Sequence, residues 1–342
     1  MRIGLLTGGG DCPGLNAVIQ AAVARAAQYG FEVFGIKNGY EGLIKGEIEP
    51  LKKEDVEGIY EIGGTMLGTS RKNPVKSEED VKKVMENIKK FQLDALITIG
   101  GDDTLGAAEK LYERGVPIVG VPKTIDNDLS ATDYSIGFWT AVDIIADALS
   151  RLHTTARSHR RVIIAEIFGR YAGWLALMGG LAGGAHIILI PERPLTLEQI
   201  CEIIKKREEE GKHYTIIAVA EGVKIPEIGE LVAAAAERDE YGHVRLGGVA
   251  KLLEQEIKKR TGKDVRSVIL GHIQRGGPPN AYDRVLGIRL GYAAVDLVKE
   301  KKFGYAAVLR GTEIVPVKLS EVVGQMRKVP EEFFDYLGVF TD

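Results

Sequence analysis

Short apolar runs typical of β-strands alternate with helix-like segments along almost the whole chain. Such alternation favours an α/β fold with mainly parallel sheets flanked by helices. With 342 residues, the chain is long enough for two lobes rather than one. We expect strands at residues 2–7, 31–36, 96–100, 117–121, 162–167, 186–190, 214–220 and 266–270, and helices near 15–29, from Ser77, between the strands ending at 100 and 121, and near 140–153.

Two acidic turns each follow one of these strand-like runs. The first places Asp102 and Asp103 after a glycine pair, and the second carries Lys123, Asp126 and Asp128. In an open parallel sheet the ligand crevice lies outside the carboxyl ends of the strands, so these side chains should converge. Clustered carboxylates favour a hard cation such as magnesium, and glycine N–H groups suit phosphate oxygens. The pattern predicts metal-assisted phosphoryl transfer.

Asp102 and Asp103 also have a plainer interpretation, as caps of a helix that starts near Thr104. One aspartate would be enough for that purpose. A second carboxylate beside it, with Asp126 and Asp128 on the next turn, favours a metal-binding or proton-transfer role instead. Clustered carboxylates raise one another's pKa, which suits a general base.

A glycine turn, Gly8-Gly9-Gly10, joins the first expected strand to the first expected helix. Free N–H groups and the helix dipole at such a turn favour a bound phosphate. Tight turns also use glycine for steric reasons alone, so this turn by itself is weak support. Its spacing differs from the dinucleotide fingerprint and from the Walker loop, which speaks against a nicotinamide dehydrogenase or a P-loop ATPase.

Cationic side chains gather at the ends of later strands. Arg161 and Arg170 bracket the run 162–167, Arg266 opens the last expected strand, and His272 and Arg275 follow it. Arginine suits phosphate because its planar fork makes paired hydrogen bonds. Each of these residues has an alternative as an ordinary surface residue, but together they favour a sugar phosphate. Glu221, after the run 214–220, is a candidate to receive a sugar hydroxyl, with an ordinary turn residue as the alternative.

The composition limits the other classes of protein. The formal net charge is −3 and no basic stripe is present, which speaks against nucleic acid as a partner. No apolar stretch is long enough for a membrane helix, and the glycine turn comes too early for a signal peptide. Two cysteines, Cys12 and Cys201, suit a reducing cytoplasm. Residues 224–248 have weak periodicity and suggest a surface insertion around the charged cluster 237–240.

At these motifs the chain closely resembles the phosphofructokinase family over nearly its whole length. The segments that carry the resemblance are Gly8-Gly9-Gly10-Asp11, Gly63-Gly64-Thr65 with Arg71, Gly100-Gly101-Asp102, Thr124-Ile125-Asp126-Asn127-Asp128, Gly169-Arg170, Glu221 and Gly271-His272-Ile273-Gln274-Arg275-Gly276-Gly277. The resemblance implies two similar α/β lobes with the active site in the cleft between them. It implies a donor lobe of residues 1–137 and about 274–322, and a sugar-phosphate lobe of 138–273 and about 323–342.

The resemblance also implies a reaction and a role for each residue. The expected reaction is reversible phosphoryl transfer to O1 of fructose 6-phosphate, giving fructose 1,6-bisphosphate, in glycolysis or gluconeogenesis. Asp126 is implied as the general base, Asp102 as the ligand of Mg²⁺ with Asp128 assisting, and Arg170 as the group that neutralises developing charge. Thr124 and Lys123 complete the catalytic set. The implied donor-binding residues are Gly10, Arg71, Asp103, Thr104 and Lys123. The implied substrate-binding residues are Thr124, Asp126, Asp128, Arg161, Phe168, Gly169, Arg170, Glu221, Arg266, His272 and Arg275.

Two positions bear on the phosphoryl donor. Members of the family that use ATP typically carry glycine where this chain has Asp103 and Lys123. Asp103 adds bulk and negative charge where the α-phosphate and ribose of ATP would pass, and Lys123 adds a cation beside the phosphates. This pair resembles the pyrophosphate-dependent branch, and the alternative is an ATP-dependent 6-phosphofructokinase. In the family, the residues matching Arg161 and Arg266 reach the neighbouring subunit's site, which implies a homodimer or homotetramer.

The chain departs from the family pattern at several positions. Phe168 replaces a common methionine, which bears on the choice of sugar. Bacterial allosteric members have basic residues at the positions of Gln20, Ala24 and His153, and an acidic one at that of His186, so we expect no effector regulation. Two further alternatives are a kinase of NAD or lipid, which lacks the segment 271–277, and a catalytically silent sugar-phosphate sensor, which would have lost Asp126 or Asp102.

Overall fold

The computed structural model describes residues 1–225 and 248–341. The chain divides into two compact units. Unit 1 consists of Met1–Thr140 and Arg275–Met326, and unit 2 consists of Ala141–Gln274 and Arg327–Asp342. The surface insertion expected around residues 237–240 lies outside the described residues.

Unit 1 is built on a seven-stranded sheet with the order β11-β10-β5-β4-β1-β2-β3. The five inner strands are parallel, and the two edge strands β3 and β11 are antiparallel to their neighbours. Strands β1, β4 and β5 are almost wholly buried, because helices cover both faces of the sheet. The strands are β1 (Arg2–Thr7), β2 (Glu32–Ile36), β3 (Ile48–Leu51), β4 (Ala95–Gly100), β5 (Ile118–Pro122), β10 (Tyr305–Arg310) and β11 (Glu313–Lys318).

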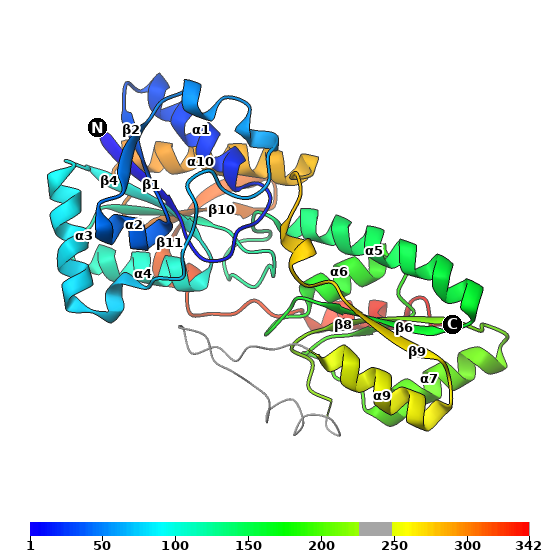
Figure 1. Ribbon diagram of the computed structural model, residues 1–342. Helices are drawn as coiled ribbons and strands as arrows, with labels where there is room; N and C mark the ends of the chain where they lie inside the picture. Colours follow the sequence, from blue (N-terminus) through cyan, green and yellow to red (C-terminus); the bar gives the residue numbers. More distant parts are fainter. Residues whose placement is uncertain (226–247, 342) are drawn as a thin grey trace. The chain divides into compact units, whose positions relative to one another are not determined.

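Two groups of helices cover the two faces of this sheet (Figure 1). Helices α1 and α10 pack on each other over one face; α2, α3, α4 and α11 pack over the other, where the large apolar cluster lies. The close approach of α1 and α10 depends on glycine: a Cβ on Gly291 would lie 2.6 Å from the carbonyl oxygen of Val18. The helices are α1 (Leu15–Gln28), α2 (Gly39–Lys45), α3 (Glu78–Lys90), α4 (Asp102–Glu113), α10 (Ala281–Lys299) and α11 (Leu319–Val322), with short 3₁₀ turns η1 (Glu54–Val56), η2 (Ile59–Glu61) and η3 (Pro74–Lys76).

Unit 2 is built on a four-stranded parallel sheet with the order β7-β8-β6-β9. Helices α5 and α6 lie over one face of the sheet, and α7 and α9 lie over the other (Figure 1). Strand β9 is an edge strand and is partly exposed. The elements are α5 (Phe138–His159), β6 (Val162–Ile167), α6 (Trp174–Ala182), β7 (Ile187–Leu189), α7 (Leu197–Glu209), β8 (Thr215–Ala220), α9 (Val249–Thr261), β9 (Val265–Ile269), η4 (Gly271–Arg275) and η5 (Glu331–Gly338).

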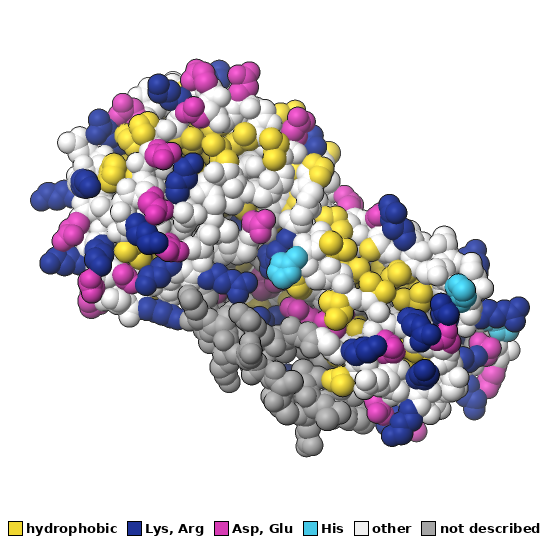
Figure 2. All heavy atoms as spheres, in the orientation of Figure 1, with side chains coloured by type: hydrophobic (Ala, Val, Ile, Leu, Met, Phe, Trp, Pro, Cys, Tyr) yellow, Lys and Arg dark blue, Asp and Glu magenta, His cyan; other side chains and the backbone are white. Residues whose placement is uncertain are grey.

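The prediction of an α/β fold with mainly parallel sheets flanked by helices is confirmed. Local signals explain several boundaries: Ser77 caps α3, because its hydroxyl accepts a hydrogen bond from the N–H of Asp80. Helix α5 is longer than expected and continues to His159. Within the described ranges, no helix has the length and apolar character needed to cross a membrane. Basic and acidic side chains are interspersed on the face shown in Figure 2.

Candidate active site

The glycine turn after β1 is held by contacts on all sides. A Cβ on Gly8 would lie 2.6 Å from the side chain of Thr104, and a Cβ on Gly10 would lie 2.5 Å from the guanidinium of Arg275. Gly9 adopts a φ of +78°, which glycine tolerates without strain. Packing against Thr104 therefore favours glycine at position 8, and backbone conformation favours it at position 9.

The turn differs from a simple helix N-terminal anion site in two ways. The N–H of Gly8 donates to Ile99 O at 2.9 Å, and the N–H of Gly9 donates to Ser70 O at 3.1 Å, so both groups bind the protein itself. Helix α1 begins at Leu15 with Gly14 as its N-cap, four residues beyond Gly10. The prediction that free N–H groups of this turn bind a phosphate together with the helix dipole is therefore wrong for Gly8 and Gly9. Their N–H groups already donate to carbonyl groups of the protein.

A second loop, residues 62–71, is tied to the glycine turn. The hydroxyl of Thr69 donates to Gly9 O at 2.6 Å, and the hydroxyl of Thr7 donates to Gly68 O at 2.7 Å. Arg71 follows Ser70 directly, and its side chain is exposed. These bonds bring the predicted donor residues Gly10 and Arg71 to the same part of unit 1.

Helix α4 begins at Asp102, and its N-cap is Gly101. The plainer alternative, in which an aspartate caps a helix that starts near Thr104, is therefore wrong, and the helix begins two residues earlier. Both Asp102 and Asp103 lie exposed in the first turn, where the helix dipole favours negative charge, and α4 has no side-chain cap. Asp102 Oδ1 accepts a hydrogen bond from the N–H of Gly324 at 2.9 Å.

Thr104, a predicted donor-binding residue, has a different position from its two acidic neighbours. Its side chain is only 3 % exposed. It fills the space beside Gly8 and Gly100, since a Cβ on Gly100 would lie 2.4 Å from Thr104 Cβ. Its carbonyl oxygen accepts a hydrogen bond from the hydroxyl of Tyr40 at 3.0 Å. The Thr104 side chain therefore packs against the glycine turn and stabilises it.

The second acidic turn, residues 123–128, follows β5 and is organised by Thr124. The Thr124 hydroxyl accepts a hydrogen bond from the N–H of Asp126 at 3.1 Å and donates to Asp128 Oδ1 at 3.3 Å. The Thr124 carbonyl accepts from the hydroxyl of Ser135 at 2.6 Å. Asn127 has a φ of +52°, and its Oδ1 accepts from the N–H of Ser135 at 3.2 Å. Thr124 thus binds the backbone of Asp126 and the carboxylate of Asp128.

Three of the four predicted carboxylates influence one another. Burial raises the pKa of Asp128 to about 7, and the negative charges of Asp126 and Asp102 act in the same direction. Asp128 therefore lies within electrostatic reach of Asp126 and Asp102, and the convergence of all four carboxylates stays a prediction. Near neutral pH the turn carries one carboxyl group that readily gains or loses a proton.

Lys123 lies directly against the glycine turn. Its side chain is 4 % exposed, and its Nζ donates a hydrogen bond to Gly10 O. A Cβ on Gly9 would lie 3.6 Å from Nζ. Burial lowers the pKa of the Lys123 amine, and the nearby Arg275 guanidinium lowers it further. Cys12 beside it is inert, because burial raises the pKa of its thiol to about 12.

Arg275 belongs to unit 1 and contacts the same glycine turn. Its NH1 donates to Asp11 O at 3.3 Å, and its guanidinium lies against Gly10. The sequence grouped Arg275 with the sugar-phosphate residues. The structure places it with the predicted donor residues Gly10 and Lys123.

In unit 2, four predicted residues follow the carboxyl ends of neighbouring strands. Phe168 and Arg170 follow β6, Glu221 follows β8, and His272 follows β9. The rings of Phe168 and His272 are 5.7 Å apart and perpendicular, and the N–H of Glu221 donates to Ile167 O at 2.8 Å. These side chains therefore lie at the carboxyl ends of the parallel strands. Gly169, with a φ of +136°, allows the chain to turn after β6.

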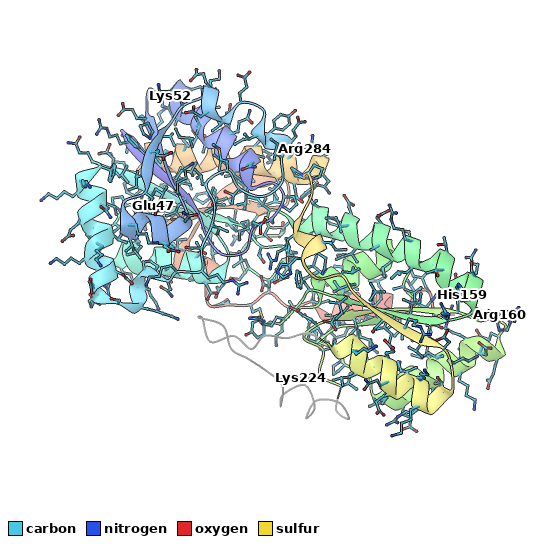
Figure 3. All side chains as sticks on the ribbon, viewed as in Figure 1. Glu47, Lys52, His159, Arg160, Lys224 and Arg284 are labelled. Atoms are coloured by element: carbon cyan, nitrogen blue, oxygen red, sulfur yellow. The ribbon has the colours of Figure 1, made fainter. Side chains whose placement is uncertain are left out.

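Arg161 and Arg266 lie at the opposite end of the same strands, near the residues at which the strands begin. Both form ion pairs with Asp264, and Arg266 NH1 is 2.9 Å from Asp264 Oδ1. The Arg161 guanidinium lowers the pKa of the Asp264 carboxyl. His159 and Arg160, labelled in Figure 3, lie at this end of the strands, where α5 ends. The six residues of β6 separate the amino and carboxyl ends of this strand by roughly 20 Å. These arginines therefore lie far from Arg170 in the same chain.

The sequence did not reveal the structural roles of two buried side chains in unit 2, Gln274 and Glu166. Gln274 is fully buried, and its amide bonds to the backbone of Phe168 and Gly271. The carboxylate of Glu166 accepts hydrogen bonds from Gly248 N at 3.0 Å and Ala250 N at 2.9 Å, and so caps α9. The signal for Glu166 was present in the sequence, because an acidic residue in an otherwise apolar strand needs a partner.

A family profile described as "Phosphofructokinase" matches residues 2–298. This chain belongs to the phosphofructokinase family. A relative named pyrophosphate–fructose 6-phosphate 1-phosphotransferase, from Dictyoglomus thermophilum, is 53 % identical over 340 residues, which cover 99 % of this chain and 98 % of the relative. A relative from Streptomyces coelicolor, named ATP-dependent 6-phosphofructokinase 3, is 47 % identical and covers 97 % of both chains.

Solved phosphofructokinases share the fold. The crystal structure of a pyrophosphate-dependent phosphofructokinase from Marinobacter aquaeolei matches 99 % of this chain and 91 % of its own, with a TM-score of 0.84 and 23 % sequence identity. The fold of this chain is therefore that of the phosphofructokinases.

The carboxylates of unit 1 are candidate oxygen ligands for a metal ion. Among the residues that the structure describes, no group of three or more His, Cys, Asp or Glu side chains is arranged to hold a metal ion alone. Mg²⁺ is commonly bound by one or two carboxylates together with substrate phosphates and water. The carboxylates of Asp102, Asp126 and Asp128 fit that kind of site, in which the substrate supplies the remaining ligands.

Proposed function

We propose that this protein transfers a phosphoryl group from pyrophosphate to O1 of fructose 6-phosphate, giving fructose 1,6-bisphosphate and phosphate in a reversible reaction of glycolysis and gluconeogenesis. The observation that carries the proposal is the match, over nearly the full length of both chains, to relatives with this activity in their names, at 50–53 % identity. ATP-dependent relatives match at 47 %. The buried Lys123 amine at the glycine turn supports pyrophosphate as the donor.

The carboxylate turn supports a proton-transfer role. Asp126 acts as the general base that removes the proton from the O1 hydroxyl, and Thr124 fixes its position through the hydrogen bond to its backbone. Asp128, with a pKa of about 7, can share charge with Asp126 during this step. When bound, Mg²⁺ held by Asp102 and assisted by Asp128 would neutralise charge on the pyrophosphate oxygens.

The donor function is assigned to unit 1. Gly10, Arg71 and Lys123 bind the pyrophosphate oxygens, and Thr104 supports the turn that holds them. Asp103 is exposed in the first turn of α4 and disfavours the α-phosphate of a nucleotide by charge and bulk. The repulsion from Asp103 and the attraction of Lys123 act in the same direction, toward the smaller donor.

The sugar-phosphate function is assigned to unit 2. Phe168, Gly169, Glu221 and His272 bind fructose 6-phosphate, and Arg170 neutralises charge on the transferring group. A role in binding the sugar phosphate is also proposed for Arg275, which contacts the glycine turn of unit 1.

Arg161 and Arg266 act on the site of a neighbouring subunit in a homodimer or homotetramer. The support is their position at the amino ends of β6 and β9, roughly 20 Å from the residues that follow β6 in their own chain. Asp264 holds both guanidinium groups together, which suits binding of one phosphate by two arginines.

The enzyme is proposed to be cytoplasmic and without effector regulation. His153 and His186 stand at positions where allosteric members have charged residues, and their rings pack edge to face on each other and on Tyr214. Burial lowers the pKa of His186 to about 3, so this residue stays neutral and offers no charge to an anionic effector. Gln20 is engaged with the N–H of Tyr60 at 3.0 Å.

The test is product identification with purified protein, fructose 6-phosphate, magnesium and pyrophosphate. The proposal expects fructose 1,6-bisphosphate and one phosphate per turnover, and the reverse reaction when phosphate is added to fructose 1,6-bisphosphate. Formation of fructose 1,6-bisphosphate only with ATP would favour the ATP-dependent alternative. Binding of fructose 6-phosphate without turnover with either donor would favour a sensor.

A further inference from the structure

Gln274 joins the two loops that carry predicted sugar-phosphate residues. Its side chain is 0 % exposed. Oε1 accepts a hydrogen bond from the N–H of Phe168 at 3.2 Å, and Nε2 donates to Gly271 O at 3.0 Å. The first loop follows β6 and continues to Arg170, and the second is η4, which contains His272. One buried amide thus connects the backbones of both loops.

The chemistry of this connection is specific to an amide side chain. A neutral amide provides a donor and an acceptor on one planar group, which matches one N–H and one C=O. In a buried position such a pair of bonds fixes a loop, since any movement leaves polar groups unpaired. The perpendicular contact between the rings of Phe168 and His272 depends on the same register of the two loops.

The chain also passes from unit 2 to unit 1 at this point. Gln274 is the last residue of the segment 141–274, and Arg275, which contacts the glycine turn, is the first of the segment 275–326. Fixing Gln274 therefore fixes the end of the sugar-phosphate loop where the chain continues toward the donor residues.

We propose that Gln274 is a positioning residue for fructose 6-phosphate: its two backbone hydrogen bonds hold Arg170 and His272 in the register that binds the sugar phosphate. This inference rests on the proposed function and adds a substrate-positioning role to the structural contacts of Gln274 described above. It acts through the two loops and does not itself touch the substrate.

The test is Gln274→Met, which keeps length and volume but removes both hydrogen bonds. The KM for fructose 6-phosphate should rise about ten-fold, which corresponds to about 1.4 kcal/mol. The KM for pyrophosphate should stay within about two-fold, because both partners of Gln274 lie in the loops of unit 2. Calorimetric binding of fructose 6-phosphate should weaken by the same factor.

Two further variants make the result decisive. Gln199→Met is the matched control, because the Gln199 amide also bonds to backbone, at Thr196 in the capping box of α7, away from both loops; its kinetics should match the parent. Gln274→Asn keeps the amide but is too short to reach both partners, so it should change KM in the same direction as Gln274→Met and replaces it if that variant does not fold.

The outcomes separate the two claims. A folded Gln274 variant with unchanged affinity for fructose 6-phosphate overturns the positioning role. An equal loss of affinity for both substrates also overturns it, because the effect would then be general. A parent that does not phosphorylate fructose 6-phosphate refutes the proposed function instead, and the calorimetric comparison then still decides the role of Gln274.

Discussion

Replacing Lys123 with methionine should separate catalysis from stability. The amine is buried and donates to Gly10 O, and burial lowers its pKa. The charged form therefore exists at a cost in folding free energy, which is unexpected for a group without a function. We predict that Lys123→Met strongly reduces turnover with pyrophosphate and leaves the free energy of unfolding nearly unchanged.

The magnitude follows from opposing contributions. Leaving the Gly10 carbonyl without its donor costs about 1–3 kcal/mol. Removing a buried ammonium relieves a desolvation cost of several kcal/mol, and methionine fills the space. The net change in unfolding free energy should be within about 2 kcal/mol. Loss of one preorganised donor to the transferring group typically costs about 10²–10³-fold in kcat.

The pH dependence of stability gives a second readout. Because the pKa of Lys123 is lowered in the folded protein, the unfolded chain binds more protons at pH values between the lowered pKa and about 10.4. In that window the parent gains stability as the pH rises. Lys123→Met should lack this gain.

The assay combines initial rates with pyrophosphate and chemical unfolding at several pH values. Lys110→Met is the matched control, because Lys110 is exposed on α4 and should change neither quantity. A Lys123→Met variant that keeps turnover within about three-fold of the parent would refute the assignment of the Lys123 amine to the donor phosphates.

Three further predictions concern the base, the shared site and regulation. Asp126→Asn should lower kcat by about 10²–10⁴-fold with fructose 6-phosphate binding retained, measured by kinetics and calorimetry; turnover within a few-fold of the parent would contradict its role as base. Arg161→Ala and Arg266→Ala should each weaken fructose 6-phosphate binding, and subunits with Arg266→Ala mixed with Asp126→Asn subunits should recover some activity, whereas no recovery in well-exchanged hybrids would place the arginines in their own chain's site. ADP and phosphoenolpyruvate should leave the saturation curve nearly hyperbolic, because His186 is neutral and buried; a several-fold shift in half-saturation would require a second site.

The parts of the fold that depend on local pattern were predictable from the sequence. The strand 162–167 has the bounds of β6, because its apolar run is bounded by a charged residue and a glycine turn. The edge strands β3 and β11 were not identified, because exposed edge strands have a weaker apolar pattern than buried ones. The inner strand β10, between β11 and β5, was not identified either. The start of α4 was placed two residues late, because aspartates suit the first turn of a helix as well as its cap.

The candidate site shows the same division. The sequence placed Asp126 and Asp128 on one turn, and the structure adds that Thr124 bonds to both. The bonds of Gly8 and Gly9 to carbonyl groups of other segments could not be derived, because they depend on how distant loops meet. The linking role of Gln274 depends on a contact with Phe168, more than a hundred residues away, which no local pattern specifies.

The most direct test of pyrophosphate as the donor is kcat/KM for pyrophosphate and for ATP, measured side by side with fructose 6-phosphate in the parent and in Asp103→Gly. Asp103 lies exposed in the first turn of α4, where its charge and bulk oppose the α-phosphate of a nucleotide. We predict a higher kcat/KM for pyrophosphate in the parent, and a shift of the ratio toward ATP in the variant. A parent that uses ATP better than pyrophosphate would contradict the proposed donor.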